Sequence, residues 1–337
     1  SWQVALSLVL LVCAGLLVTS FRRLVTLDPG FDASGVLVVG VDWSSANLAE
    51  DRRSVFPREL VTRVRQVPGT LHTSAAILTP IHGMLWNENV ISEGFADGGD
   101  ELVWFNAVSE GYLATLRQRL RAGRDFSERD GPGSAPVVIV NETLARRFFG
   151  DGDPLGRWLR VNSHDELEPP MEIVGVVEDA KYRRLDETIT PTAYVPLDQS
   201  EPWGSSVQLA LRAHGAPSGL IPAVVDAMRE VHPGLSLEFR TLSDQVAGSL
   251  ARPRLLALLS AFFGVLALLL AVVGLYGTMA YDVTRRRSEI GVRIALGARR
   301  AGILRMVAGE AGRTIALGLV LGGLLTFATT RWLSALL

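Results

Sequence analysis

Residues 285–313 read RRRSEIGVRIALGARRAGILRMVAGEAGR and place eight arginines between two apolar stretches. The preceding stretch, 255–281, reads LLALLSAFFGVLALLLAVVGLYGTMAY, and the following one, 314–330, reads TIALGLVLGGLLTFATT. Both are close to the length of helix that crosses a hydrocarbon core. The sequence therefore predicts two transmembrane helices joined by a short basic loop at 282–313.

A third apolar run opens the chain at residues 1–21 and is free of charge. A cleaved signal peptide is the alternative to a membrane helix. No basic segment precedes this run, however, and the sequence at its end, TSFRR (19–23), does not resemble a small-residue cleavage site. We expect an uncleaved transmembrane helix here.

The basic loop sets the expected orientation, because arginine-rich short loops stay in the cytoplasm. Against the eight arginines, this loop has only Asp282, Glu289 and Glu310. Residues 22–254 are then expected outside the cytoplasm, in a multi-pass membrane protein. Residues 331–337 would form a tail at the outer interface, and we expect a longer polypeptide around this stretch.

The external segment, 22–254, alternates strand-like and helix-like patterns and predicts an α+β domain. A strand, a helix and a strand are predicted at 35–43, 52–67 and 71–78. The same order recurs near the end of the segment, at 206–213, 217–231 and 235–242. We expect two βαβ-like units that pack into one lobe near the membrane.

Between these units, residues of about 80–200 predict a mostly β lobe that is inserted in the first and lies farther from the membrane. PVVIVNETLARRFFGDGDPLGRWLRV (136–161) reads as a strand, a helix capped by Asn141, a turn and a strand. Further strands are expected at 171–179 and 192–197. The external domain is thus predicted to have two lobes.

Motifs that would indicate catalysis are weak or missing from the sequence. Lys181 is the only lysine and no glycine-rich loop precedes it, so no Walker A site is present. The five histidines lack metal-ligand spacing, and the acidic SHDELEPP (163–170) around His164 reads as a hairpin tip. The single Cys13 lies in an apolar run, and the net charge of −2 gives no support for nucleic-acid binding. We expect a protein that is not an enzyme and holds no metal or cofactor.

The basic loop contains a short helix pattern, with Glu289 and Arg293 four residues apart and Ile290 and Ile294 on one face. One interpretation is an interfacial helix held by anionic lipids. The other is a docking element for a cytoplasmic partner, which would transmit its movement along both flanking helices. The residues alone leave both interpretations open.

The stretch EIGVRIALGARRAGILRMVAGEAG (289–312) resembles the loop after the second membrane helix of MacB/FtsX-like ABC-transporter permeases. GRDFSERD (123–130) and the stretch 136–161 resemble the periplasmic core domain of the same family, and residues 3–32 resemble the start of the second half of duplicated permeases. The resemblance covers nearly the whole chain. The family has a fourth membrane helix, which does not occur before residue 337, and no ATPase domain is fused within the chain.

The resemblance implies a permease subunit that couples cytoplasmic ATP hydrolysis to movement of an external domain, which is called mechanotransmission. Export or membrane extraction of peptides, lipoproteins or hydrophobic drugs would follow from it. ATP would be bound by a separate subunit. By position, the residues expected to meet that subunit are Glu289, Ile290, Gly291, Arg293, Ala295, Leu296, Gly297 and Ala298.

Other partners follow from the same resemblance: a second permease half or copy, membrane lipids, and a periplasmic adaptor, lipoprotein or hydrolase. Gly318 and Gly322 form a small-xxx-small face on which another membrane helix could pack. An alternative function is a regulator that transports nothing and activates a periplasmic hydrolase through its external domain. A membrane sensor and a soluble enzyme rank lower, because the chain re-enters the membrane and has three apolar runs.

Overall fold

In this computed structural model the described residues are 2–288, except 47, 54, 84–85, 93–100, 164–165 and 201–203, together with a few isolated residues after 288. Contacts divide the chain into two units. One is formed by residues 27–249, and the other by 1–26 with 250–337. Each unit is described by itself.

Residues 27–249 are called the external unit. Four strands from its two ends form one antiparallel sheet in the order β2-β11-β1-β12. These strands are β1 (Val36–Asp42), β2 (Thr70–Ala76), β11 (Ser206–Ala213) and β12 (Ser236–Thr241). β11 lies between β1 and β2, and β1 lies between β11 and β12. Each βαβ unit is therefore split by a strand of the other, the interleaved arrangement of ferredoxin-like sheets. The prediction of two such units is confirmed, although their strands are not direct neighbours.

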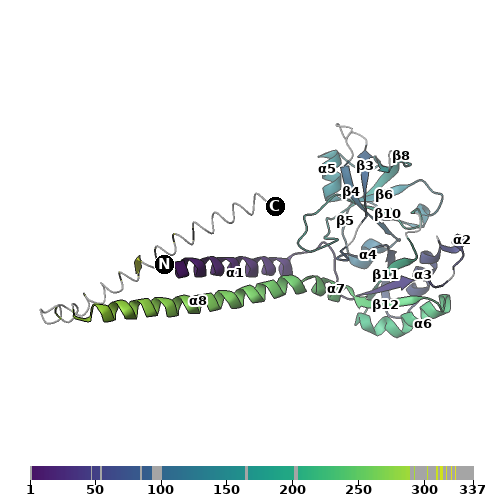
Figure 1. Ribbon diagram of the computed structural model, residues 1–337. Helices are drawn as coiled ribbons and strands as arrows, with labels where there is room; N and C mark the ends of the chain where they lie inside the picture. Colours follow the sequence, from purple (N-terminus) through teal and green to yellow (C-terminus); the bar gives the residue numbers. More distant parts are fainter. Residues whose placement is uncertain are drawn as a thin grey trace. The chain divides into compact units, whose positions relative to one another are not determined.

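Two helices cover one face of this sheet, as Figure 1 shows for α3 and α6. The helices of this part are α2 (Glu50–Arg53), α3 (Phe56–Arg65), the 3-10 turn η2 (Pro217–Leu220), α6 (Ile221–Val231) and α7 (Leu242–Ser249). The α3 stripe of Phe56, Leu60 and Val64 is fully buried against the sheet. The prediction of one helix over 52–67 is wrong at its start. α2 ends at Arg53 and α3 begins at Phe56, with Pro57 in its first turn, where the missing proline N–H has no intrahelical acceptor to lose.

The inserted segment, about 80–200, is rich in strands, as predicted, and six of them close into a ring. The ring order is β4 (Glu101–Val108), β3 (Trp86–Ser92), β7 (Trp158–Ser163), β9 (Met171–Val177), β6 (Val137–Asn141) and β10 (Thr192–Pro196). β10 closes it, because β10 pairs with β6 on one side and in parallel with β4 on the other. Ala76 of β2 pairs with Val108 of β4 and joins the ring to the first sheet.

The ring has its own core, built from residues of every strand in it and from helix α5 (Glu142–Phe149). Smaller elements complete the segment: α4 (Tyr112–Leu116), β5 (Leu120–Gly123), the 3-10 turn η1 (Glu128–Asp130) and β8 (Glu166–Leu167). The turn expected at 150–156 is confirmed. β7 pairs with β8, with Ser163 opposite Glu166, whereas the hairpin tip predicted at His164 lies outside the described residues. Residues 27–249 nevertheless form one compact unit, so the division into two lobes stays a prediction.

The second unit contains two helices that are long and apolar enough to cross a membrane, α1 (Trp2–Thr26) and α8 (Ala251–Arg285). They are longer than the predicted spans 1–21 and 255–281. Large apolar side chains are exposed around both helices, which suits a lipid environment. The third predicted span, 314–330, lies outside the described residues except for 316, 320 and 323.

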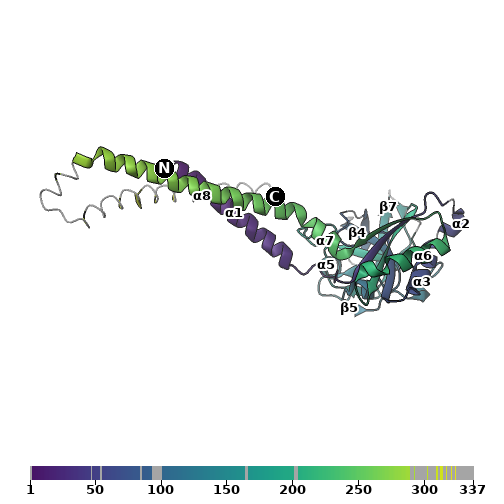
Figure 2. The ribbon, with the colours of Figure 1, turned by 90° about the horizontal axis from the view of Figure 1, so that it is seen from below.

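Helices α1 and α8 lie side by side, as Figure 2 shows, and small residues form their contact. Ser7 Oγ donates a hydrogen bond to the Ala267 carbonyl at 3.1 Å. A Cβ at Gly264 would lie 3.1 Å from the Ala14 Cβ. Close approach through glycine, alanine and serine is how helices associate in lipid, where apolar bulk gives no driving force.

We predict that Asn141→Ala destabilises the external unit by about 2–4 kcal/mol, since a lost cap and a second orphaned buried N–H both contribute. Asn141 Oδ1 accepts from the Leu144 amide at 2.9 Å and the Thr192 amide at 3.0 Å, which confirms the predicted cap. Thermal unfolding and hydrogen exchange over residues 141–149 measure the effect. The exposed Asn87→Ala on β3 is the control, with a change within about 0.5 kcal/mol.

We also predict that Ala14→Cys with Gly264→Cys, in a Cys13→Ala background, forms a disulfide on mild oxidation. The Cβ separation of 3.1 Å needs only a small relaxation to reach the usual 3.5–4.5 Å. Leu16→Cys with Gly264→Cys is the matched control, because Leu16 is 55% exposed. Equal crosslinking of both pairs on a gel would contradict the helix contact.

Candidate functional site

The chain enters and leaves the external unit at one corner of the first sheet. Leu37, at the start of β1, pairs with Thr241, at the end of β12. The two flanking segments are also bonded to each other, since Ser243 Oγ donates to the Ala33 carbonyl at 3.0 Å. The segments that follow α1 and precede α8 in the sequence are thus held together.

A buried arginine fastens the first of these segments to the sheet. Arg212 on β11 is 3% exposed and carries its side chain on the face that α4 covers. Its guanidinium donates to the carbonyls of Thr115 at 2.7 Å, Ser34 at 2.8 Å and Asp32 at 2.7 Å. It also pairs with the Asp32 carboxylate at 3.2 Å. Arg212 thus connects residues 32–34 to both β11 and α4.

Helix α7 fastens the second segment to the start of the inserted ring. Gln245 Nε2 donates to Thr79 Oγ1 at 3.2 Å and to the Pro80 carbonyl at 2.7 Å. The next residue, Ile81, has φ of 62°, a strained value for a β-branched side chain. Its amide donates to the Tyr182 carbonyl at 2.6 Å. The segment that joins β2 to the ring is thus held by hydrogen bonds with Gln245 of α7 and with the Tyr182 carbonyl.

Three buried tyrosines, Tyr112, Tyr182 and Tyr194, join α4 to the ring. The Tyr182 hydroxyl bonds the Tyr112 hydroxyl and the Asn106 amide, and Asn106 also bonds both backbone groups of Leu78. Burial raises the pKa of all three tyrosines. They stay protonated at neutral pH and act as hydrogen-bonding groups, not as bases.

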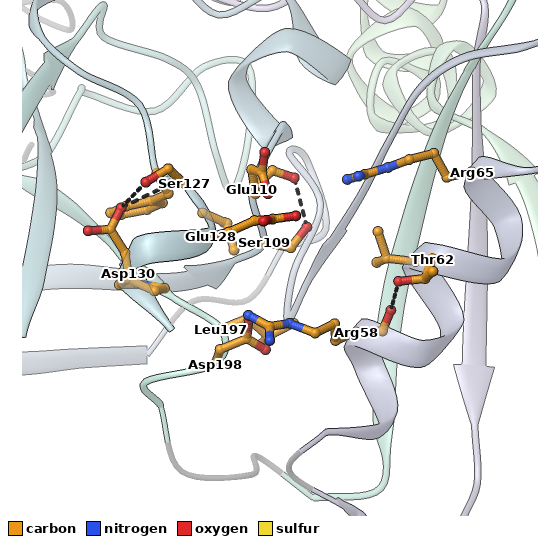
Figure 3. A pocket seen from close by; sticks show the side chains of 14 residues that line it. Arg58, Thr62, Arg65, Ser109, Glu110, Ser127, Glu128, Asp130, Leu197 and Asp198 are labelled. Atoms are coloured by element: carbon orange, nitrogen blue, oxygen red, sulfur yellow. Dashed lines mark hydrogen bonds and ion pairs between the residues drawn. The ribbon is translucent and has the colours of Figure 1, made fainter. Parts of the chain in front are cut away.

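A polar cleft of about 370 Å³ lies between α3 and the ring (Figure 3). Arg58 and Arg65 line it from α3, and Glu110, Glu128 and Asp198 line it from the opposite loops. Arg58 bridges the cleft to Asp198 at 2.7 Å. The two walls carry opposite charges, so electrostatic attraction favours their approach.

The cleft offers charge complementarity but no catalytic constellation. Ser127 and Asp130 bond each other as the capping box of η1, and Arg124 pairs with Asp130 at 2.7 Å. No histidine lines the cleft among the described residues. In the part of the chain that the structure describes, no three His, Cys, Asp or Glu side chains gather to hold a metal.

The residues predicted to meet the ATP-binding subunit lie outside the described residues. They are Glu289, Ile290, Gly291, Arg293, Ala295, Leu296, Gly297 and Ala298. The predicted packing residues Gly318 and Gly322 also lie outside them. Sequence reasoning missed Arg212 and Gln245, because no local pattern distinguishes them from the surface arginines and glutamines. It also missed the small-residue face of α1, although the spacing of Ser7 and Ala14 is a seven-residue repeat that could have indicated it.

Two family comparisons cover most of the chain. Residues 4–231 match the MacB-like periplasmic core domain, and residues 261–337 match the FtsX-like permease C-terminal domain. The chain belongs to the MacB/FtsX-like ABC-transporter permeases. This permease is therefore a component of an ABC transporter, in a membrane-associated family with a periplasmic domain, and members of that family are generally not catalytic themselves.

Curated relatives of this permease include a probable export ATP-binding/permease protein of Pseudomonas fluorescens, 27% identical over 66% of this chain and 34% of its own length. The macrolide export ATP-binding/permease protein MacB 2 of Aeromonas hydrophila is 27% identical over 84% of this chain and 42% of its own length. The chain thus spans between a third and a half of these relatives. Among solved structures, the periplasmic region of MacB from Actinobacillus actinomycetemcomitans has a TM-score of 0.44 and 14% identity, covering 66% of this chain and 95% of that one.

We predict that Arg212→Ala destabilises the external unit by about 3–5 kcal/mol, because the Asp32 carboxylate and three carbonyls lose a buried charged donor. Arg117→Ala is the matched control. It pairs with the same carboxylate at 2.9 Å but is 61% exposed, so its loss costs about 1 kcal/mol or less. Thermal unfolding measures both, and equal effects would show that the buried contact is not the stabilising one.

The pH dependence of stability provides a separate prediction for Asp32. Burial alone would raise the pKa of this carboxyl group, but hydrogen bonds from Ser34 and the positive charges of two arginines lower it below its ordinary value. The stabilisation is therefore present above about pH 4 and is lost as the pH falls through the lower folded-state pKa. Asp32→Asn removes this contribution. The difference in melting temperature between wild type and variant should be largest near pH 7 and shrink below about pH 4, whereas a constant difference would contradict the assignment.

Proposed function

We propose that this permease couples ATP hydrolysis by a separate cytoplasmic subunit to movement of its periplasmic domain. The observation that carries the proposal is the shared corner of the first sheet, where Leu37 pairs with Thr241. A single corner that holds both flanking segments can turn a small displacement of two helices into a rigid movement of the sheet. Two separate attachment points would resist such a movement.

The proposal includes membrane crossing by α1, α8 and the apolar run 314–330, with the basic loop 282–313 in the cytoplasm. The support is the apolar surface of α1 and α8, their small-residue contact and the arginines of the loop. Residues 27–249 would then lie on the periplasmic side. The sheet β2-β11-β1-β12 would form the lobe near the membrane, and the ring would form the distal lobe.

We propose that this movement drives the export, or the extraction from the membrane, of a peptide, a lipoprotein or a hydrophobic drug. Relatives named as export or macrolide export ATP-binding/permease proteins support export as the function of the transporter. The cleft between α3 and the ring supports an opening and closing movement, because only Arg58 and Asp198 form an ion pair across it among the described residues. ATP would be bound by the partner subunit, with no cofactor held in this chain. A second permease half or copy would complete the membrane domain, and an adaptor would connect the periplasmic lobes to further components.

The test of the proposal is charge reversal in the basic loop. Glu289→Arg with Arg293→Glu should weaken association with the ATP-binding subunit by about tenfold or more, as expected for loss of close charged contacts across an interface. Co-purification and ATPase stimulation in lipid nanodiscs measure the effect. Glu310→Arg, in the same loop but outside the predicted contact set, is the control and should leave both unchanged. Retained association and coupled ATPase activity in the double variant would contradict the proposal.

A further inference from the structure

Another cavity lined by described residues of the external unit lies at one mouth of the strand ring and is larger and less polar than the cleft. Its volume is about 510 Å³, within the range of small-molecule sites, and barrel mouths are common places for them. Every strand of the ring contributes to its lining. The contributing side chains are Trp86, Glu88, Phe105, Val137, Val161, Met171 and Val195.

The wall of this cavity is aromatic and aliphatic. Trp86 and Phe105 are cross-strand partners on β3 and β4, and their rings stack with centroids 6.0 Å apart. Val161 and Met171 come from β7 and β9. Such side chains accommodate an apolar body, while the indole ring also attracts a positive charge through its π-face.

A carboxylate faces the inside of the ring within this apolar wall. Glu88 stands on the same side of β3 as Val90, two residues later, whose side chain is fully buried in the ring core. Its direct cross-strand partner is the fully buried Val103. Among the described residues no ion pair or hydrogen bond involves the Glu88 side chain. Glu88 therefore presents a half-buried negative charge, with no ionic partner among the described residues, to a ligand at this mouth.

The described residues around the cavity do not supply a positively charged partner for Glu88. No basic side chain is among the described residues that line the cavity. Arg160 is next to Val161 on β7, but alternation places it on the other face of the strand, where its guanidinium lies 5.5 Å from the Trp158 ring centroid. A second carboxylate, Glu168, also lines the cavity and adds negative charge.

We propose that the mouth of the ring is a binding site for an amphiphilic cation, with its apolar body against Trp86, Phe105 and Met171 and its ammonium group at Glu88. This site goes beyond the proposed function, because it requires neither ATP hydrolysis nor movement of the helices. It selects ligands by charge, since an anion of the same shape would meet the carboxylate of Glu88.

The test uses the full chain in lipid nanodiscs and isothermal titration calorimetry, with empty nanodiscs as the blank for lipid partitioning. The probe is 4-phenylbutyltrimethylammonium, and the matched anion is 5-phenylpentanoate. Wild type should bind the cation at least about tenfold more tightly than the anion. Equal affinities, or heat no larger than that of empty nanodiscs, would overturn the proposal.

Two variants locate the binding within the molecule. Glu88→Gln keeps the shape of the site and should weaken the cation about tenfold while leaving the neutral analogue 4-phenylbutanol unchanged. Glu128→Gln, in the cleft beside α3, is the matched control and should bind the cation as wild type does. Melting temperatures show that each variant is folded. Unchanged cation binding in folded Glu88→Gln would overturn the site, whatever the outcome of the ATPase experiments.

Discussion

The pairing of β1 with β12 is the constraint on which the rest of this permease depends. It exists because two split βαβ units interleave, so that the first and last strands of the external unit become neighbours. A continuous ladder of backbone hydrogen bonds joins the two strands, so the corner at Leu37 and Thr241 is one connected body. Arg212 and Gln245 extend this body to α4 and to the start of the ring.

The ring is attached to the first sheet by specific polar contacts as well as by backbone pairing. Asn106 and the buried tyrosines satisfy one another in a water-excluded region, where an unpaired polar group would be costly. Ile81 holds a strained conformation in the same connection. Strain of this kind persists only where the surroundings over-determine it, so the contacts around Ile81 define the geometry of this connection.

Local patterns predicted the elements, and distant contacts could not be predicted. The strands 35–43 and 206–213, the Asn141 cap and the long apolar helices follow from periodicity, capping and hydrophobicity within a few residues. The parallel pairing of β10 with β4 joins residues nearly ninety positions apart, and Arg212 meets Asp32 from an even greater separation. The sequence contains no local signal for such pairings. The coupling residues of the basic loop stay a prediction that rests on resemblance.

The most direct test of the account is the membrane topology that it requires: the folded unit on one side and the basic loop on the other. Single cysteines at His72, which is exposed on β2, and at Arg300 are placed in a Cys13→Ala background. Spheroplasts are then treated with a membrane-impermeant maleimide. The account predicts labelling at 72 in intact spheroplasts and at 300 only after permeabilisation. Labelling at 300 in intact spheroplasts would contradict it.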